Sequence, residues 1–304
     1  MSLTKRSHYV PDFYLKSFAI PGTNPLCITV QEVCGDGVRI GQTTNEAVET
    51  HLYRIRQKDG EDDHSLEKSF SKIEWKASAV IRKIDERCEV GDLSPEEGAD
   101  FAMFVGSMIV RTPQYFESVS VMFERLKNLV EKIKNGTATP EEIGDRSEEK
   151  INGLISDAER GAFTDENIVS QVGQYHISGT IASNFAKIIL EKMYWVIARA
   201  EPNEFYCTCD DPVLTWSESR NLWRQSLGNE DAEVIFPLSP KTCFLASRNQ
   251  KIKKRSTEVI NNLVVWQAYK YVYSSRKDGI NLDSRREAEK ILPRTEALNR
   301  LGKM

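Results

Sequence analysis

One segment in the first third of the chain predicts a helix that has almost no polar face. Its start is well marked, because Ser94 is suited to the N-cap, Pro95 to the first helical position and Glu97 to a capping box. The apolar run Phe101–Val110 then covers every side of the helix, and Pro113 predicts its end or a kink. A helix with such a surface has to be surrounded by other elements. We therefore expect this helix at the centre of the core.

The rest of the chain divides into sections of different composition. Residues 1–64 and 201–250 favour strands, and residues from about 65 to 200 favour helices. Two closing helices are expected within 256–304, one over Ser256–Tyr273 and one from Ser284. Strands and helices do not alternate regularly, so the sequence predicts an α+β fold. We expect a single domain over residues 1–304, with a mainly helical core and a small mixed or antiparallel sheet formed by the N-terminal and C-terminal sections.

Composition limits the classes of partner. The chain has 304 residues, of which 40% are hydrophobic and 28% charged, as is typical of soluble globular proteins. Its formal net charge of −4 gives no overall attraction to nucleic acid or to an anionic membrane, although a local basic patch can still provide one. The longest apolar run is about half of a membrane span, and the start has no apolar signal segment. We expect a cytoplasmic protein without a membrane partner.

The six cysteines contain no C-x-x-C pair and lie far from the histidines in sequence. We expect them to be reduced side chains that pack as small apolar residues, not metal ligands.

The opening segment is unusually apolar for the start of a chain. Its aromatic and aliphatic side chains surround a single histidine, His8, and Pro11 predicts a short helix that begins there. Chain ends are normally frayed and polar unless they are docked. We expect Phe13, Tyr14 and Phe18 to anchor this helix in the core, which would hold His8 inside the protein, where an imidazole can bind metal or transfer protons.

Three further polar residues lie in apolar surroundings. Arg111 directly follows the apolar helix and needs an anionic partner if it is buried, either a carboxylate in a structural ion pair or a ligand such as phosphate. Glu74 has Ile73 and Ala77 as neighbours, which indicates an inward carboxylate, although a solvated helix face is the alternative. Asp210 follows a predicted strand and is a candidate site residue, but Asp210-Asp211-Pro212 is also typical of a turn.

Other candidates are weaker. Ser239, between Pro237 and Pro240, lies on a rigid turn without the G-x-S-x-G pattern of a nucleophilic serine. His51 and His64 lie in polar loops, and His176 lies in a predicted helix. The basic run 251–255 is typical of a solvated loop before a helix, and contact with phosphate is the alternative.

Several of these motifs together resemble a bacterial family, domain of unknown function 4238. They are the opening HYVPxFYLxxF (residues 8–18), Leu52-Tyr53 after Asn45, Ile73-Glu74, Val110-Arg111-Thr112-Pro113, Trp195, Phe205, Thr208–Val213, Phe236–Pro240 and Asn261-Asn262. The usual form of the aspartate motif is Thr-Ser-Asp-Asn-Pro-Val, so Cys209 and Asp211 depart from it and Asp210 is the family's aspartate. The resemblance covers most of the chain and implies no particular reaction.

Two classes of function follow. The first is a metal-dependent phosphodiester hydrolase of the nuclease type, with His8, Glu74, Asp210 and Arg111 as the candidate catalytic residues. His8, Glu74 and Asp210 would bind Mg²⁺ or Mn²⁺, Arg111 would hold the phosphate, and nucleic acid would be the partner. The alternative is a non-catalytic binding or effector module in which these groups form a buried structural network. In either case the chain is a candidate effector of a defence or toxin system, and the sequence identifies no protein partner.

Overall fold

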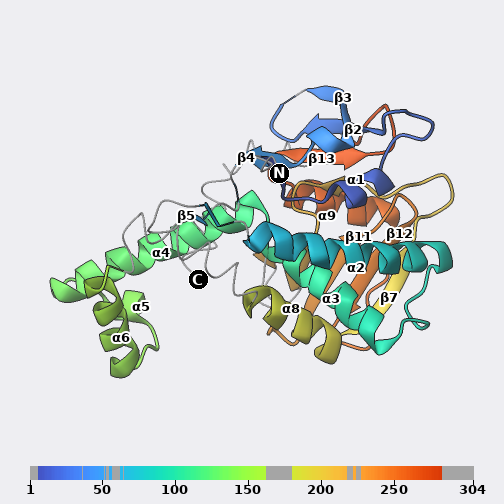
Figure 1. The fold of residues 1–304 in the computed structure, drawn as a ribbon. Coiled ribbons are helices and arrows are strands. Elements are labelled where there is room, and N and C mark those ends of the chain that lie inside the picture. The colour runs from blue at the N-terminus through green and yellow to red at the C-terminus, as the bar shows by residue number, and fades with distance from the viewer. Residues whose placement is uncertain are drawn as a thin grey trace.

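The apolar helix predicted from residue 95 is helix α3 (Pro95–Val110), and its side chains form much of the core. It packs between α2 (Ser65–Arg87) and α8 (Thr180–Lys192), as Figure 1 shows. Gly106 permits the close approach of α8, because a Cβ at this position would lie 2.4 Å from the carbonyl oxygen of Ala182. The prediction of a surrounded central helix is confirmed.

The computed structural model describes residues 6–35, 37–50, 52, 55–56, 62–63, 65–161, 180–217, 222–223 and 227–282. Within this part of the chain the fold is α+β, as the sequence predicts. The remaining helical elements are α1 (Asp12–Ser17), η1 (Thr43–Asn45), α4 (Pro113–Lys134), α5 (Pro140–Ile143), α6 (Glu148–Glu159) and α9 (Thr257–Gln267). Helices α4, α5 and α6 project from one side of the body (Figure 1), and α4 and α6 share a small apolar cluster that includes Phe123 and Val130.

The strands form antiparallel sheets. One has the order β10-β9-β11-β12-β7 and contains β7 (Tyr194–Arg199), β9 (Leu214–Ser217), β10 (Leu222–Trp223), β11 (Ala232–Pro237) and β12 (Thr242–Ser247). The other has the order β3-β2-β13-β8 and contains β2 (Cys27–Glu32), β3 (Val38–Gln42), β8 (Thr208–Cys209) and β13 (Tyr271–Ser274). Two short ladders pair β1 (Arg6–His8) with β4 (Val48–Thr50) and β5 (Ile55–Arg56) with β6 (Asp62–Asp63).

The second of these sheets joins the two ends of the chain. Its strand β13 pairs with β2 on one side, where Tyr273 faces Val30, and with β8 on the other, where Tyr273 faces Thr208. The N-terminal and C-terminal sections therefore meet in one sheet, as the sequence predicts. The five-stranded sheet is built from residues 194–247 and packs against α3, since Phe101 contacts the rings of Trp195 and Phe244 edge-on.

The structure differs from the predicted boundaries at two places. The section predicted as helical to about residue 200 ends in strand β7, directly after α8. The helix predicted over Ser256–Tyr273 ends at Gln267, because Ala268 adopts extended backbone angles and the chain continues into β13. The helix predicted from Ser284 lies outside the described residues.

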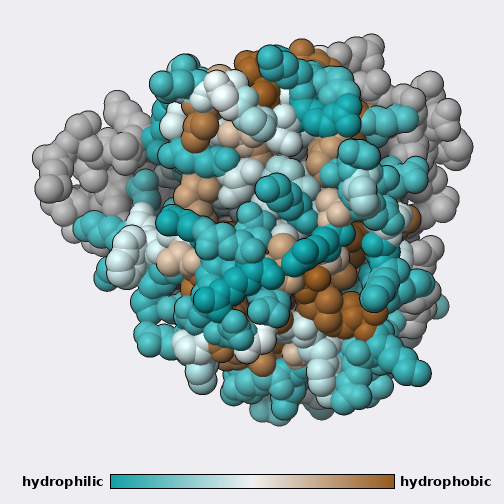
Figure 2. Space-filling model, turned by 90° about the vertical axis from the view of Figure 1, so that its right-hand side faces the viewer, coloured by the Kyte–Doolittle hydropathy of each residue, from teal (hydrophilic) through white to brown (hydrophobic). Residues whose placement is uncertain are grey.

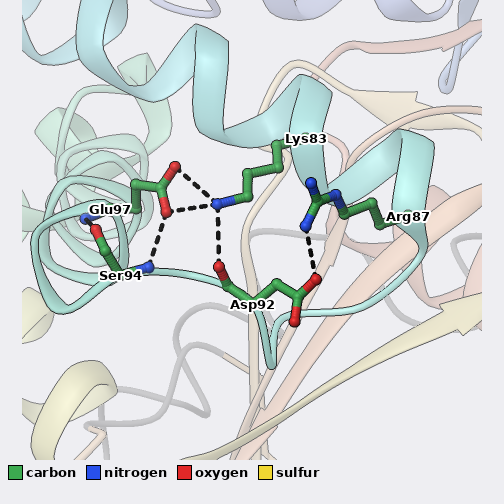
Figure 3. Close-up of polar contacts among 5 residues, drawn as sticks. All are labelled: Lys83, Arg87, Asp92, Ser94 and Glu97. Atoms are coloured by element: carbon green, nitrogen blue, oxygen red, sulfur yellow. Dashed lines mark hydrogen bonds and ion pairs between the residues drawn. The ribbon is translucent and has the colours of Figure 1, made fainter.

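The turn from α2 to α3 carries the capping box that the sequence predicts. Glu97 donates its backbone N–H to the Ser94 hydroxyl, and the Glu97 carboxylate accepts the backbone N–H of Ser94 at 2.8 Å. Lys83 of α2 reaches both the same carboxylate and the backbone carbonyl of Asp92, while Arg87 pairs with the Asp92 carboxylate at 2.6 Å (Figure 3). These contacts fix the angle at which α3 enters the core.

The surface is mostly hydrophilic on the side that Figure 2 shows, with hydrophobic side chains gathered in patches. Strand β7 lies toward this side in Figure 1, and its outer edge pairs with no other described strand. Leu190, Tyr194 and Val196 are large hydrophobic residues of α8 and β7 that are exposed. None of the helices in the described ranges is both long enough and apolar enough to cross a membrane.

Candidate functional site

The opening segment is docked in the core, as the sequence predicts. Helix α1 buries Tyr14, Leu15 and Phe18 completely, and Phe13 packs partly buried against the same cluster. The Tyr14 hydroxyl lies 2.6 Å from the Thr208 hydroxyl and donates to the carbonyl of Pro237 at 2.7 Å. Because both partners lie on C-terminal strands, these bonds tie the start of the chain to the two larger sheets.

His8 ends β1, just before α1, and its side chain is partly buried. Burial lowers the pKa of His8, and the nearby Arg111 charge adds to this, while Asp12, Glu74 and a hydrogen bond with the backbone of Thr44 act in the opposite direction. The net lowering makes the imidazole neutral at pH 7. Its Nε2 atom is buried and has no hydrogen-bond partner.

Arg111 lies at the C-cap of α3, where Thr112 and Pro113 already begin α4. Its side chain is 2% exposed, so the guanidinium needs partners within the protein. It donates to Glu74 Oε1 at 2.8 Å and to the backbone carbonyl oxygen of His8 at 2.6 Å, and it stacks over the ring of Phe70. Of the two alternatives that the sequence leaves open for Arg111, these contacts match the structural ion pair.

Glu74 points inward from α2, as its apolar neighbours predict. Its side chain keeps 24% exposure and accepts the hydrogen bond from Arg111. The contact joins α2 to the end of α3, and the bond from the same guanidinium to His8 adds β1 to this junction. His8, Glu74 and Arg111 therefore come together in space, although His8 takes part through its backbone.

Asp210 lies at the end of β8 and is 1% exposed. Its Oδ1 accepts the backbone N–H of Tyr269 at 2.7 Å, and its Oδ2 accepts those of Lys270 and Tyr271 at 2.7 and 3.1 Å. Burial raises the pKa of Asp210 to about 6, against the opposite effect of these three hydrogen bonds, so the group is mostly ionised at pH 7. The carboxylate thus holds the turn that connects α9 to β13.

Asp211 makes a separate set of contacts. Its Oδ1 accepts a hydrogen bond from the Thr112 hydroxyl at 3.0 Å, and its Oδ2 accepts one from the Gln267 amide. All three side chains are buried. They link the junction of α3 and α4 to the end of α9. The sequence does not predict these roles of Thr112 and Gln267. Thr112 lies about a hundred residues before Asp211 and Gln267 about sixty residues after it, and nothing in their local sequence indicates this partner.

The residues predicted to bind a divalent cation do not fit such a site. Among the described residues, no three side chains of the His, Cys, Asp or Glu type form a group that could hold a metal ion. Both oxygens of Asp210 face backbone N–H groups, which point toward an anion and not toward a cation. His8, Glu74 and Asp210 are therefore not gathered around one point, and a catalytic role for them stays a prediction.

The weaker candidates also have structural partners. Ser239 is 4% exposed, and its hydroxyl bonds Asp85 of α2 and accepts the backbone N–H groups of Lys241 and Thr242. Arg255 of the basic run pairs with Glu233, in the loop before α9 that the sequence predicts. Burial raises the pKa of the Cys207, Cys209 and Cys243 thiols. His51, His64 and His176 lie outside the described residues.

Two open hollows lie away from the four candidate residues. One, of about 330 Å³, lies between α2 and α3 and is lined by Ser69, Lys72, Ile73, Lys76, Asp100 and Met103. The other, of about 450 Å³, lies near the start of α9 and the segment after β13, where Asn262, Arg276 and Asp278 are among its lining residues. Neither contains His8, Glu74, Arg111 or Asp210.

The polar contacts described above join residues from the N-terminal, central and C-terminal parts of the chain. The family model described as protein of unknown function (DUF4238) matches residues 6–278. The chain belongs to this family. Within the region that matches DUF4238, Arg111 bonds the backbone of His8 and Thr112 bonds Asp211, so residues far apart in this region contact one another across the fold. The search for similar proteins found no match among the curated proteins and none among the solved structures.

Proposed function

We propose that this protein is a non-catalytic binding module in which the buried polar cluster stabilises the fold. The observation that carries the proposal is the environment of Asp210, whose two carboxylate oxygens accept three backbone hydrogen bonds at 1% exposure. A carboxylate used for metal binding or proton transfer needs a lone pair directed at the reacting group. Asp210 directs its lone pairs at the turn from α9 to β13.

The Arg111 contacts support the same proposal. A guanidinium that holds a phosphate in a hydrolase has to face the substrate, but this one is 2% exposed and contacts Glu74, Phe70 and the backbone of His8. Networks of this kind can specify one packing arrangement without taking part in a reaction. Binding would then use a different surface, and we propose nucleic acid as the ligand class.

We place the protein in the cytoplasm, since Cys207, Cys209 and Cys243 are buried thiols that form no disulfide.

The proposal is tested with purified protein, plasmid DNA, single-stranded DNA and RNA, in Mg²⁺ or Mn²⁺ and in chelator. We expect no cleavage that distinguishes the wild-type chain from His8→Ala. The His8→Ala variant keeps the backbone carbonyl that Arg111 binds, so it should fold, and its circular dichroism spectrum checks this. Cleavage that requires the metal and is lost in His8→Ala would contradict the proposal.

The second candidate is the phosphodiester hydrolase, and the ring of His8 is the observation that favours it. A neutral imidazole whose Nε2 has no hydrogen-bond partner can accept a proton from an attacking water. The described residues do not supply the Mg²⁺ or Mn²⁺ site that this hypothesis includes. An effector role in a defence or toxin system stays a prediction, which the growth of bacteria that express the chain would test.

A further inference from the structure

Helix α2 carries the most exposed large hydrophobic side chain in the described part of the molecule. Trp75 is 78% exposed, although its neighbour Glu74 points to the interior and contacts Arg111. A single exposed hydrophobic residue needs no explanation by itself. The residues on the same face of the helix decide whether Trp75 belongs to a binding surface.

Three cations share that face with Trp75. Lys68, Lys72 and Arg82 lie seven and three residues before it and seven residues after it, spacings that place them on one side of an α-helix. None of the three forms an ion pair with a described residue. The other cations of the helix differ, because Lys76, Lys83 and Arg87 each pair with an acidic residue of the following segment. These pairs are Lys76–Asp100, Lys83–Glu97 and Arg87–Asp92.

Few acidic residues lie along the central part of this stretch in the described chain. Between Lys68 and Arg82 the only acidic residue of α2 is Glu74, which points inward to Arg111. On α3, Asp100 pairs with Lys76, and Glu96 lies near the same lysine. The face therefore carries three cations with no ion pair to a described residue, and Glu67 and Glu86 of α2 lie at its two ends. Selection for solubility alone would not require cations without anions here.

The surface has the dimensions of an extended ligand. Lys68 and Arg82 are fourteen residues apart, which corresponds to roughly 21 Å along the helix axis. The 330 Å³ hollow between α2 and α3 opens beside it, and Lys72 belongs both to the hollow and to the cationic face. A ligand along α2 could thus contact the indole, the cations and the hollow at once.

We propose that this face of α2, defined by Lys68, Lys72, Trp75 and Arg82, binds single-stranded nucleic acid. The three cations would contact backbone phosphates along the strand, and a base would stack on the exposed indole. A single strand fits better than a duplex, because the bases of a duplex are already stacked and cannot reach Trp75. An acidic peptide would satisfy the cations, but it would need an aromatic side chain at the right spacing to stack on the indole, whereas every nucleotide carries a base.

The inference rests on the proposed function, because it describes a ligand that is bound and not cleaved. The experiment measures the fluorescence anisotropy of a labelled oligothymidylate of about 15 nucleotides, titrated with the full chain. Base stacking predicts that Trp75→Ala weakens binding by roughly five-fold to a hundred-fold, and that Trp75→Phe restores part of it. Trp266→Ala, which removes a tryptophan of α9 that is 40% exposed, is the matched control and should bind as the wild type does.

The salt dependence gives a second readout. Each phosphate contact to a single strand contributes about −0.7 to the slope of log K against log salt. The double variant Lys68→Ala, Lys72→Ala should therefore reduce the slope by about 1.4 between about 50 and 200 mM salt. The control for the loss of a cation elsewhere is Lys127→Ala, which changes an exposed residue of α4. This variant should leave the slope of log K against log salt unchanged.

Three results would contradict the inference: no binding by the wild-type chain at low salt, equal affinity for the Trp75→Ala and Trp266→Ala variants, or binding of an acidic peptide without binding of the oligonucleotide. The products are also separated on a gel. Binding accompanied by cleavage would refute the proposed function and leave the inference on α2 standing. Absence of binding by the wild-type chain would refute the inference and the nucleic-acid ligand of the proposed function, and would leave the structural role of the polar cluster standing.

Discussion

The guanidinium of Arg111 donates a hydrogen bond to the backbone carbonyl of His8, with 2.6 Å between Nη2 and the oxygen, across 103 residues of chain. The same side chain pairs with Glu74, so one buried cation holds β1, α2 and the end of α3 together. This junction ties the opening segment to the helical part of the core, and it gives the side chains of Arg111 and Glu74 partners within the protein.

Loss of Arg111 should be costly to the fold. Arg111→Ala removes both hydrogen bonds from a site that is 2% exposed, and we expect it to lower the free energy of unfolding by about 3 kcal/mol. Arg111→Lys should lower the free energy of unfolding by a smaller amount, because an ammonium keeps the charge but cannot reproduce the planar geometry of the guanidinium. Urea unfolding measures both. Lys16→Ala, which breaks the surface pair with Asp12, should cost under about 0.5 kcal/mol. Equal effects for Arg111→Ala and Lys16→Ala would refute the junction.

The two neighbouring aspartates should respond differently to the same change. Asp210→Asn replaces an acceptor oxygen with an amide that cannot accept the backbone N–H groups, and we expect a loss of about 2 kcal/mol in unfolding free energy. Asp211→Asn also replaces a carboxylate with an amide. Its amide can still accept from Thr112, and it can donate to Gln267 after that side chain turns, so the loss should stay below about 1 kcal/mol. A larger loss for Asp211→Asn than for Asp210→Asn would be inconsistent with these contacts.

The lowered pKa of His8 gives a pH dependence with a definite sign. Because the folded pKa lies below the unfolded value near 6.5, the unfolded chain binds more protons between these two values. Stability should therefore rise with pH through that window, and the contribution should be lost as the pH falls below about 6.5. The contribution of His8 is measured by comparing the unfolding midpoints of the wild type and of His8→Gln between about pH 7.5 and 5.5. A wild type that gains stability relative to His8→Gln on acidification would contradict the prediction.

The capping box at the start of α3 should contribute measurably. Ser94→Ala leaves the backbone N–H of Glu97 without its side-chain acceptor, and we expect a loss of about 1 kcal/mol in unfolding free energy. Ser71→Ala is a suitable control, since Ser71 lies within α2 and its hydroxyl only bonds back to the carbonyl of Glu67. That substitution should change stability by less than about 0.5 kcal/mol.

Local signals in the sequence predicted the parts of the fold that depend on nearby residues. Ser94 and Pro95 mark the start of α3 through contacts within a few residues, and the structure confirms this start. Pro113 predicts the end of α3 or a kink, and in the structure α3 ends at Val110 and Pro113 begins α4. The short helix after Pro11 and its buried aromatics were also predictable, because so apolar a segment has to be buried. The strand β7 was not, since no glycine or proline separates it from α8.

The candidate site was predictable in its residues but not in their roles. His8, Glu74 and Arg111 do meet, yet their residue types alone do not distinguish a metal site from an ion pair. The role of Asp210 depends on a turn about sixty residues later in the chain, and no local pattern indicates that contact. The cationic face around Trp75 could have been found from the spacing of Lys68, Lys72 and Arg82, which follows the helical repeat.

The most direct test of the structural role of the polar cluster is the thermal unfolding of the wild-type chain and of Asp210→Asn across a series of Mn²⁺ concentrations. A metal that binds the folded state stabilises it by about 2.7 kcal/mol at a hundred times its dissociation constant. We predict that Mn²⁺ leaves the midpoint of the wild type unchanged and that Asp210→Asn unfolds at a lower temperature at every concentration. A midpoint that rises with Mn²⁺ in the wild type, but not in Asp210→Asn, would contradict the account.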